Sequence, residues 1–290
     1  MNEYSKSLFY IHLAVFLFGF VGLFARFVNQ PAIIITFGRS FFSSIFLFVL
    51  IKCSGTNAKL NSRNDYILIF VSGLILAIHW YCFMESIQLS TVAIGTITFS
   101  AFPIFTSILE PILFREKISL RSVICSIIMI VGVCIISSVP AGGEFGGRVS
   151  GVILGMVSSL SYAVLSLLNR NFSSKYKPEI IVFYEQATAM VLIMPFFFIL
   201  RPAIAVKDVV LLIILGTLLT AFSHMMYVKS LRNLKVTTAG IITGLEAVYS
   251  IILAVFLLKE KPSFNEIIGG LIVIGIAAYI TLFKGKPGHG

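Results

Sequence analysis

The chain has 290 residues, of which 58% are hydrophobic and only 12% are charged, whereas soluble domains carry roughly 25% charged residues. This composition excludes a water-soluble enzyme or binding domain and indicates a membrane protein, with a mean hydropathy of +1.01. The net charge of +10 does not predict a nucleic-acid partner, because the basic residues lie in short loops between apolar segments and form no continuous stripe.

Ten apolar segments follow one another along the chain. Each is close to the roughly 20 residues that cross the hydrocarbon core of a bilayer as a helix, so we expect an all-α membrane protein with ten transmembrane helices. The first segment lacks a small-residue cleavage site, so we expect it to remain as a helix rather than serve as a removable signal. The ten expected helices are residues 8–26, 32–51, 66–85, 91–113, 120–139, 149–168, 179–200, 209–228, 236–258 and 265–283.

Lys and Arg residues are distributed unequally between alternate loops. If the N-terminus is cytoplasmic, the cytoplasmic loops and termini carry 15 of these residues and the opposite loops carry 6. Loops rich in Lys and Arg stay on the cytoplasmic side of a membrane. The sequence therefore predicts a multi-pass protein of the plasma membrane (the inner membrane of a bacterium), with both termini in the cytoplasm.

A shift of 144 residues aligns the two halves of the chain. Residues 86–119 then lie over residues 230–263, with matches at polar as well as apolar positions. Because five helices is an odd number, a second five-helix repeat must cross the membrane in the opposite direction, as in transporters that alternate access around a midplane site. We expect one repeat over residues 1–140 and an inverted one over residues 145–284. Identical pairs include Arg26/Arg170, Ser86/Ser230, Val92/Val236, Glu116/Glu260 and Lys117/Lys261.

These features resemble the EamA-like branch of the drug/metabolite transporter superfamily over nearly the whole chain. The clearest are Glu116-Lys117 and Glu260-Lys261, which follow the fourth and ninth segments. Further points of resemblance are Gly132, Gly275 and Gly38-Arg39, together with Phe18-Gly19 where the family often has Trp-Gly. The resemblance implies ten helices around a central cavity that is lined mainly by helices 1, 3, 4, 6, 8 and 9. It also implies that helices 5 and 10 are peripheral and available for a homodimer contact, and that the substrate is a small solute.

Two carboxylates inside apolar segments are candidates for solute binding or proton coupling. Glu110 precedes Pro111 near the end of the fourth segment, and Glu246 is near the middle of the ninth. Charged groups within membrane helices are unfavourable and usually face a cavity or a partner. A structural hydrogen bond or ion pair inside the bundle is the alternative interpretation of both residues.

A second group of candidates combines imidazole with aromatic rings. His79 and Trp80 are in the third segment, and the 144-residue shift places Trp80 over His224 in the eighth. Such side chains suit a cavity that holds an amphipathic or cationic solute, although Trp and Tyr also favour membrane interfaces. We include Tyr162 of the sixth segment and Tyr249 of the ninth among the residues expected to line the cavity.

Arg39 in the second segment, with Glu185 and Gln186 in the seventh, is expected to be structural or to act as a gate partner. No metal or cofactor is expected. The cysteines, which include no CxxC pair, are expected to behave as small apolar residues. They are Cys53, Cys82, Cys125 and Cys134.

The function we expect is secondary transport of a small metabolite, an amino acid or a related solute, by alternating access. No GxxxxGK[ST] motif is present in the sequence, so ATP is not expected to drive transport directly. Proton coupling and facilitated exchange both remain open. The alternatives are uptake of a nucleotide-like or cofactor-like solute, a channel or scaffold, or an intramembrane lipid-modifying enzyme. The sequence has no HExxH or paired-aspartate arrangement for such an enzyme.

Overall fold

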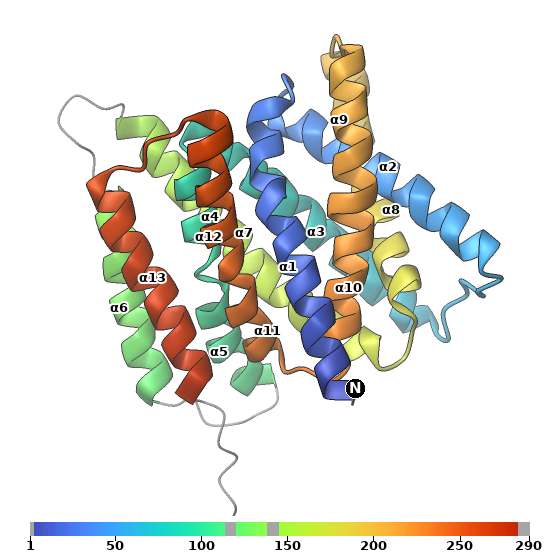
Figure 1. The fold of residues 1–290 in the computed structure, drawn as a ribbon. Coiled ribbons are helices and arrows are strands. Elements are labelled where there is room, and N and C mark those ends of the chain that lie inside the picture. The colour runs from blue at the N-terminus through green and yellow to red at the C-terminus, as the bar shows by residue number, and fades with distance from the viewer. Residues whose placement is uncertain (1–2, 114–119, 138–144, 284–290) are drawn as a thin grey trace, which may run out of the picture.

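The computed structural model describes residues 3–113, 120–137 and 145–283, and every regular element in these ranges is helical (Figure 1). Elements η1 and η2 are π-helices. The first half contains α1 Glu3–Phe27, α2 Ala32–Cys53, α3 Arg63–Leu89, α4 Val92–Phe99, α5 Phe102–Leu113 and α6 Leu120–Ser137. The second half contains α7 Phe145–Ser173, α8 Pro178–Leu200, α9 Val206–Gly216, η1 Thr217–Phe222, α10 Ser223–Ser230, α11 Val236–Thr243, α12 Leu245–Leu253, η2 Ala254–Leu258 and α13 Phe264–Phe283.

Each of the ten expected ranges overlaps helical residues within the described parts of the chain, and an all-helical membrane protein is confirmed. Within the described residues, eight spans are long and apolar enough to cross a membrane. The ranges expected as helices 5 and 10 correspond to α6 and α13. Glu116 and Lys117, which carried part of the repeat alignment, lie outside the described residues.

Three of the expected helices are not continuous α-helices. The fourth is interrupted between α4 and α5 at Ser100 and Ala101, and the ninth between α11 and α12 at Gly244. The eighth contains η1, and the ninth ends in η2. Interrupted membrane helices are tolerated where their backbone is buried in protein or lines a cavity, so the breaks between α4 and α5 and between α11 and α12 indicate the centre of the molecule, whereas most side chains of η2 are exposed.

The interrupted helices contact the continuous helices and each other. α3 contacts α7 and α8, while α1 contacts α10 and α12. α4 contacts α12, and α5 contacts α11, so the two interrupted helices meet each other. α6 and α13 stand side by side along one side of the bundle, and α2 leans outward on the other (Figure 1).

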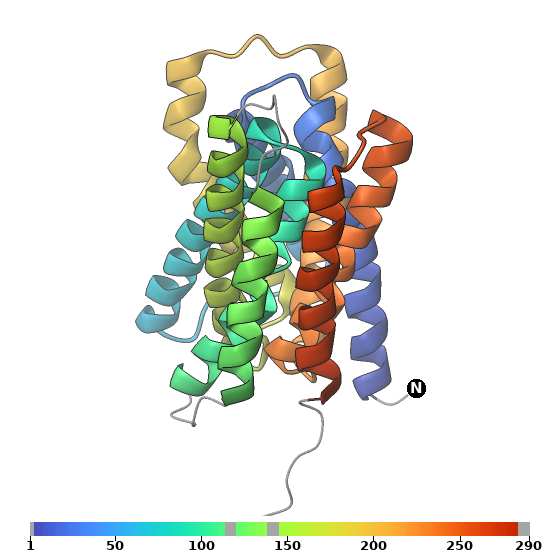
Figure 2. The same cartoon turned by 90° about the vertical axis from the view of Figure 1, so that its left-hand side faces the viewer.

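Polar contacts near the helix ends occur at the two ends of the bundle. At one end Asp65 accepts a hydrogen bond from Tyr176 Oη at 2.8 Å, and Asn233 Nδ2 donates to Ser7 Oγ at 3.0 Å. At the other end Arg148 pairs with Glu266 at 3.0 Å, and the Arg26 guanidinium donates to the Ser90 carbonyl. The start of α1 and the end of α13 lie at the same end (Figure 2).

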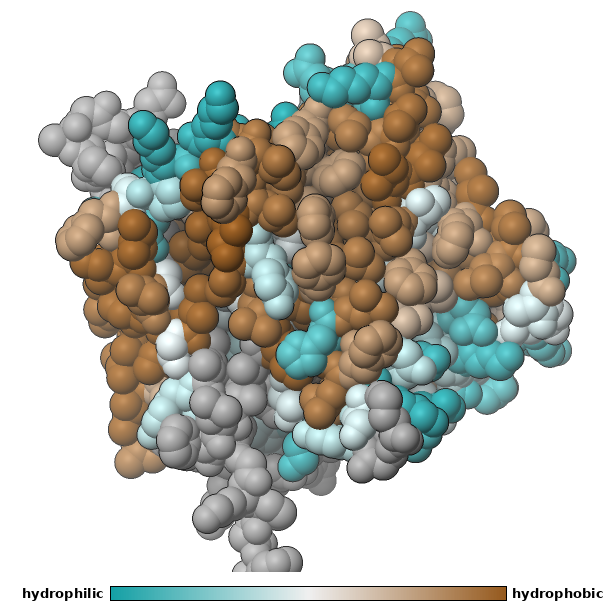
Figure 3. All heavy atoms as spheres, viewed as in Figure 1, coloured by the Kyte–Doolittle hydropathy of each residue, from teal (hydrophilic) through white to brown (hydrophobic). Residues whose placement is uncertain are grey.

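A broad apolar belt surrounds the described surface. Phe48 of α2, Phe198 of α8 and Phe256 of η2 are among many large apolar side chains that are exposed. Figure 3 shows this apolar surface across the middle of one face, with hydrophilic residues toward the two ends. Exposed apolar area of this extent favours contact with lipid over contact with water.

Candidate solute cavity

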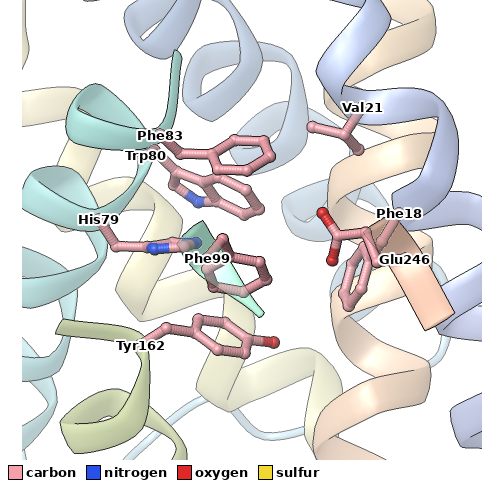
Figure 4. Close-up of a pocket in the computed structure, with 8 residues that line it drawn as sticks. All are labelled: Phe18, Val21, His79, Trp80, Phe83, Phe99, Tyr162 and Glu246. Carbon is pink, nitrogen blue, oxygen red and sulfur yellow. The ribbon is translucent and has the colours of Figure 1, made fainter. Parts of the chain in front are cut away.

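A small cavity lies at the centre of the bundle, between α1, α3, α4, α7 and α12 (Figure 4). Its free volume is about 10 Å³, which is close to the least space that can hold one water molecule. Side chains must therefore move before a metabolite fits. The lining residues are Phe18, Val21, His79, Trp80, Phe83, Phe99, Tyr162 and Glu246.

The two helix interruptions bring backbone and side chains to the cavity wall. Phe99 is the last residue of α4, and its carbonyl accepts a hydrogen bond from Ser159 Oγ of α7 at 3.0 Å. Glu246 is in the first turn of α12. One turn further along α12, Ser250 Oγ donates to the Gly19 carbonyl of α1 at 2.8 Å. The Ser159 hydroxyl therefore satisfies a carbonyl at the end of α4, and Ser250 ties α12 to α1.

His79 is held rigidly among aromatic rings. Its Nδ1 is 2.8 Å from Ser158 Oγ and 3.0 Å from the Ser158 carbonyl. Its ring centroid lies 4.7 Å from that of Tyr162 and 5.3 Å from that of Phe99. His79 is therefore a partnered histidine that contributes a flat surface to the cavity.

Trp80 lines the cavity and also contacts the buried Arg39. The Arg39 guanidinium carbon of α2 is 3.2 Å from the centroid of the Trp80 ring. Arg39 Nε and Nη2 both donate to Thr220 Oγ1 in η1, at 3.1 and 2.9 Å. A guanidinium stacked on one face of an indole is a stable cation–π arrangement, so Arg39 holds the Trp80 ring in place.

Glu246 is the acidic residue of the cavity wall. It is 4% exposed, and its carboxyl group points across the cavity toward the aromatic rings (Figure 4). A buried carboxylate needs a proton or a cationic partner, and aromatic faces attract cations. This combination is suited to a solute that carries a positive charge beside an apolar or planar group.

The other candidate residues lie outside this wall. Glu110 pairs with Arg170 of α7, and the Tyr249 ring contacts Phe16 at a centroid distance of 5.7 Å. His224 lies beside Glu185, with His224 Nε2 3.9 Å from Glu185 Oε2. Arg39, Glu185 and Gln186 are fully buried. The structure thus brings together His79, Trp80, Tyr162 and Glu246 of the predicted site residues.

Four cavity residues were not among the predicted site residues, because they are ordinary apolar side chains. Phe18 was noted only as a point of resemblance to the family. Phe18, Val21, Phe83 and Phe99 are buried, but a chain with 27 Phe residues gives no signal that separates these positions from lipid-facing ones. The Ser and Thr residues of α4 and α11 mostly bond to their own helices, as Thr98 Oγ1 does to the Ile94 carbonyl at 2.7 Å. Among the described residues, no group of three or more His, Cys, Asp or Glu side chains could hold a metal ion.

The chain matches known proteins over almost its whole length. Residues 5–138 and 149–282 each match the EamA-like transporter family. The uncharacterized transporter YxxF of Bacillus subtilis is 22% identical over 289 residues, which cover 98% of this chain and 93% of that protein. The S-adenosylmethionine uptake transporter of Rickettsia bellii is 26% identical over 254 residues, which cover 87% of this chain and 84% of that protein. The protein of that name from Rickettsia prowazekii is 24% identical over 252 residues, or 87% of this chain and 83% of its own.

The fold is also similar to that of a solved structure. A protein crystal structure superposes on this chain with a TM-score of 0.72 at 17% sequence identity. The superposition covers 96% of this chain and 97% of the other. At this identity the likeness concerns the fold alone.

Proposed function

Since the chain belongs to the EamA-like transporter family, we propose that it is a secondary transporter of a small organic solute with a positively charged group. The observation that carries this proposal is the Glu246 carboxyl, which faces a wall of aromatic rings. Ion pairing and cation–π attraction would act on the same charge. An intramembrane cavity with one acidic residue suits solute binding better than catalysis.

S-adenosylmethionine is the first solute to test. Several relatives that span most of the chain bear the name S-adenosylmethionine uptake transporter. This molecule has a sulfonium cation, an amino-acid end and a planar adenine, so it combines the amino-acid and the cofactor-like interpretations of the sequence. The sulfonium would lie near Glu246 and Trp80, and the adenine would stack on the rings of Phe83, Phe99 or Tyr162.

We also propose ten membrane spans arranged as two inverted repeats, over residues 1–140 and 145–284. The packing supports this arrangement, because contacts recur when each span is replaced by the span five places away. The contact of α3 with α7 then corresponds to that of α1 with α10, and the contact of α2 with α9 to that of α3 with α8. The pairs α2 with α8, α4 with α12 and α6 with α13 correspond to themselves.

Both termini are proposed to be cytoplasmic. The loops around Tyr176 and Asn233 belong to the end of the bundle where α1 begins, and this end contains the loops rich in Lys and Arg. Reporter fusions after Lys59, Lys175 and Lys235 should be cytoplasmic, and fusions after Ser90 and Lys207 external. Two or more reversed sites would contradict this topology.

A homodimer through α6 and α13 remains a proposal as well. These helices form one side of the bundle (Figure 1). An apolar hollow lies between them. The hollow is lined by Leu120, Ile124, Cys125, Ile128, Ile276 and Tyr279. The mass of the purified protein in detergent, measured by light scattering, would distinguish a dimer from a monomer.

Transport is best tested with purified protein in liposomes. Uptake of labelled S-adenosylmethionine should exceed that in empty liposomes and should be inhibited by the unlabelled compound. S-adenosylhomocysteine, which has a neutral sulfur, should inhibit about tenfold less. A cation–π contact contributes about 0.5–1 kcal/mol at an exposed site and about 2 kcal/mol or more at a desolvated one. Methionine and adenosine test the two ends of the molecule separately. Equal inhibition by all four compounds, or no uptake, would contradict the proposed substrate.

A further inference from the structure

A second polar cluster is buried next to the solute cavity, on the side of α8 and α10. It consists of Asn169 from α7, Glu185 and Gln186 from α8, and His224 from α10, and we refer to it as the Glu185 cluster. None of these four residues is more than 1% exposed. None of them lines the solute cavity, so the cluster is a separate site.

The polar atoms of this cluster lack partners of their own. His224 Nε2 and Glu185 Oε2 are 3.9 Å apart, which is too far for a hydrogen bond, and the Asn169 side chain lies beside the Glu185 carboxyl. Within the described part of the chain, no hydrogen bond of normal geometry reaches either Glu185 oxygen, either His224 nitrogen or the amide groups of Asn169 and Gln186, and the Asn169–Glu185 contact is the nearest to one. Buried polar atoms are normally satisfied, so this arrangement points to a small polar ligand.

The chemistry of the cluster favours a proton as that ligand. A carboxylate buried without a cationic partner is strongly unfavourable compared with the neutral acid. Glu185 offers a carboxyl, and His224 offers a neighbouring base on another helix. A proton held by Glu185 and shared with His224 through water would satisfy both groups. Asn169 can pair with the carboxyl in either protonation state, because its amide NH2 donates to a carboxylate and its amide oxygen accepts from the O–H of the acid.

Arg39 connects the Glu185 cluster to the solute cavity. Its positive charge interacts electrostatically with His224 and with Glu246. Its guanidinium stacks on the cavity residue Trp80. Its Nη1 has no hydrogen-bond partner among the described residues. Glu185 adjoins His224, with which Arg39 interacts, so a change of protonation in this pair would alter the electrostatic force on a side chain that supports the cavity wall.

The backbone around Arg39 is tightly held, so this force would move the side chain rather than the helix. A Cβ built on Gly216 would lie 2.8 Å from the Arg39 carbonyl oxygen and 2.7 Å from Phe42 Cβ. Only glycine permits this approach of α2 to the junction of α9 and η1. The other titratable groups around the cluster are His79 of α3, Tyr162 of α7, Tyr227 of α10 and Glu246 of α12.

We propose that Glu185 and His224 form a proton-binding site that is distinct from the solute cavity and is coupled to it through Arg39. The proposal rests on the proposed transport function and identifies the coupling ion. In the closed arrangement Glu185 carries the proton. When the bundle opens to water, the proton leaves the Glu185 carboxyl for water on that side, and the changed charge of the Glu185–His224 pair alters the position of Arg39 over Trp80.

The first test measures the proton without any transport. The infrared carboxyl band of the purified full-length protein, recorded in detergent during a pH titration, should contain a protonated-acid component that Glu185→Gln removes. Glu85→Gln, at the end of α3, is the matched control and should leave that component in place. If the titrating component is unchanged in Glu185→Gln, the proposal is wrong, whatever the transport assays give.

The second test separates coupling from solute movement. In liposomes, a pH gradient should drive accumulation of labelled S-adenosylmethionine by the wild type. In Glu185→Gln accumulation should fall to the level seen without a gradient, while exchange at equal pH on both sides continues at a rate close to that of the wild type. His224→Gln should shift the pH dependence of transport, and Glu185→Asp should restore gradient-driven accumulation in part.

Three results would overturn the coupling role. They are gradient-driven accumulation by Glu185→Gln equal to that of the wild type, accumulation driven by a sodium gradient in place of a pH gradient, and equal loss of exchange and accumulation in a folded Glu185→Gln protein. An absence of solute movement by the wild type would instead contradict the proposed function. The infrared titration would still decide whether the proton site exists.

Discussion

The two interrupted helices at the centre of the molecule share a backbone feature but differ in chemistry. α4 ends at Phe99 and α11 ends at Thr243, which are 144 residues apart, the same shift that aligns the halves of the sequence. Three residues after each of these ends, the first half has Phe102 and the second half has Glu246. The interruption is thus common to both halves, while the carboxyl group belongs to one of them.

This difference explains how a duplicated fold can have a site of low symmetry. Phe102 is fully buried and stacks near Phe99, with ring centroids 6.1 Å apart, so the first half contributes an apolar wall. Glu246 reaches the cavity from the opposite wall. One wall can then hold a ring of the solute while the other holds its charge.

The largest expected effect comes from removing the carboxyl group of Glu246, which belongs to the second half. Glu246→Gln should lower the efficiency of solute uptake at least about thirtyfold, because losing one partner of a buried charge pair costs about 2 kcal/mol or more. Uptake by purified protein in liposomes measures this effect. Glu85→Gln, at the end of α3, should change uptake little. Normal uptake by Glu246→Gln would show that the two interrupted helices do not differ in function.

A smaller effect is expected on the aromatic side of the same comparison. Trp80→Leu should weaken solute binding about tenfold, because a buried cation–π contact contributes roughly 1–2 kcal/mol. Trp80→Phe should retain part of the affinity, since a phenyl ring is a weaker but similar partner. Competition binding with the purified variants measures both. A Trp80→Leu protein with unchanged affinity would remove the aromatic wall from the site.

Packing around the second interrupted helix should also respond to a single methyl group. A Cβ on Gly19 of α1 would lie 2.5 Å from Tyr249 Cβ of α12, whereas a Cβ on Gly275 would have no atom within 4 Å. Gly19→Ala should therefore destabilise the protein by about 1–3 kcal/mol through overpacking. Gly275→Ala should be neutral or stabilising by up to about 1 kcal/mol. Thermal unfolding in detergent compares the two, and equal midpoints would contradict the close contact.

The smallest effect is expected in the loop after the second interrupted helix. Glu260 accepts a hydrogen bond from the Val92 backbone N–H at 3.2 Å and lies 3.8 Å from Arg26 Nε. Burial raises the pKa of Glu260 above its usual value, although Arg26 opposes this shift. The folded protein therefore binds this proton more tightly than the unfolded chain does. The contribution of Glu260 to stability is greater below its pKa and decreases as the pH rises through that value.

Glu260→Gln should remove this pH dependence. It should change the free energy of unfolding by less than about 1 kcal/mol, as is usual for partly exposed ion pairs. Thermal unfolding of wild type and variant over a series of pH values provides the measurement. Parallel pH profiles for the two proteins would assign the dependence to another group.

Much of the fold could be predicted because hydropathy determines where a membrane helix forms. The ranges expected as helices 2 and 7, residues 32–51 and 179–200, agree closely with α2 and α8. The interruptions could not be predicted in the same way. Ser100 and Gly244 are small residues that occur freely inside continuous membrane helices. Pro103, which has no N–H for the Phe99 carbonyl, favours the first interruption, but the sequence offers no comparable signal at Gly244.

The candidate site was predictable where its residues are rare in apolar segments. Glu246, His79 and Trp80 stand out for that reason and do line the cavity. His224 also stands out, yet it lies beside Glu185 instead, because a sequence shift aligns positions along a helix but does not determine which neighbour a side chain meets. Phe99 could not be identified, since its role depends on the interruption that follows it.

The π-helix η1 has a further consequence for the mechanics of the molecule. A π-helix closes its hydrogen bonds over five residues rather than four, so a given number of residues covers less length than in an α-helix. The first half has the uninterrupted α3 at the corresponding position, and the second half has α9, η1 and α10. The corresponding spans of the two halves therefore differ in length per residue and in hydrogen bonding. In an alternating cycle, the inward-open and outward-open forms are then expected to differ in free energy even when the solutions on the two sides are identical.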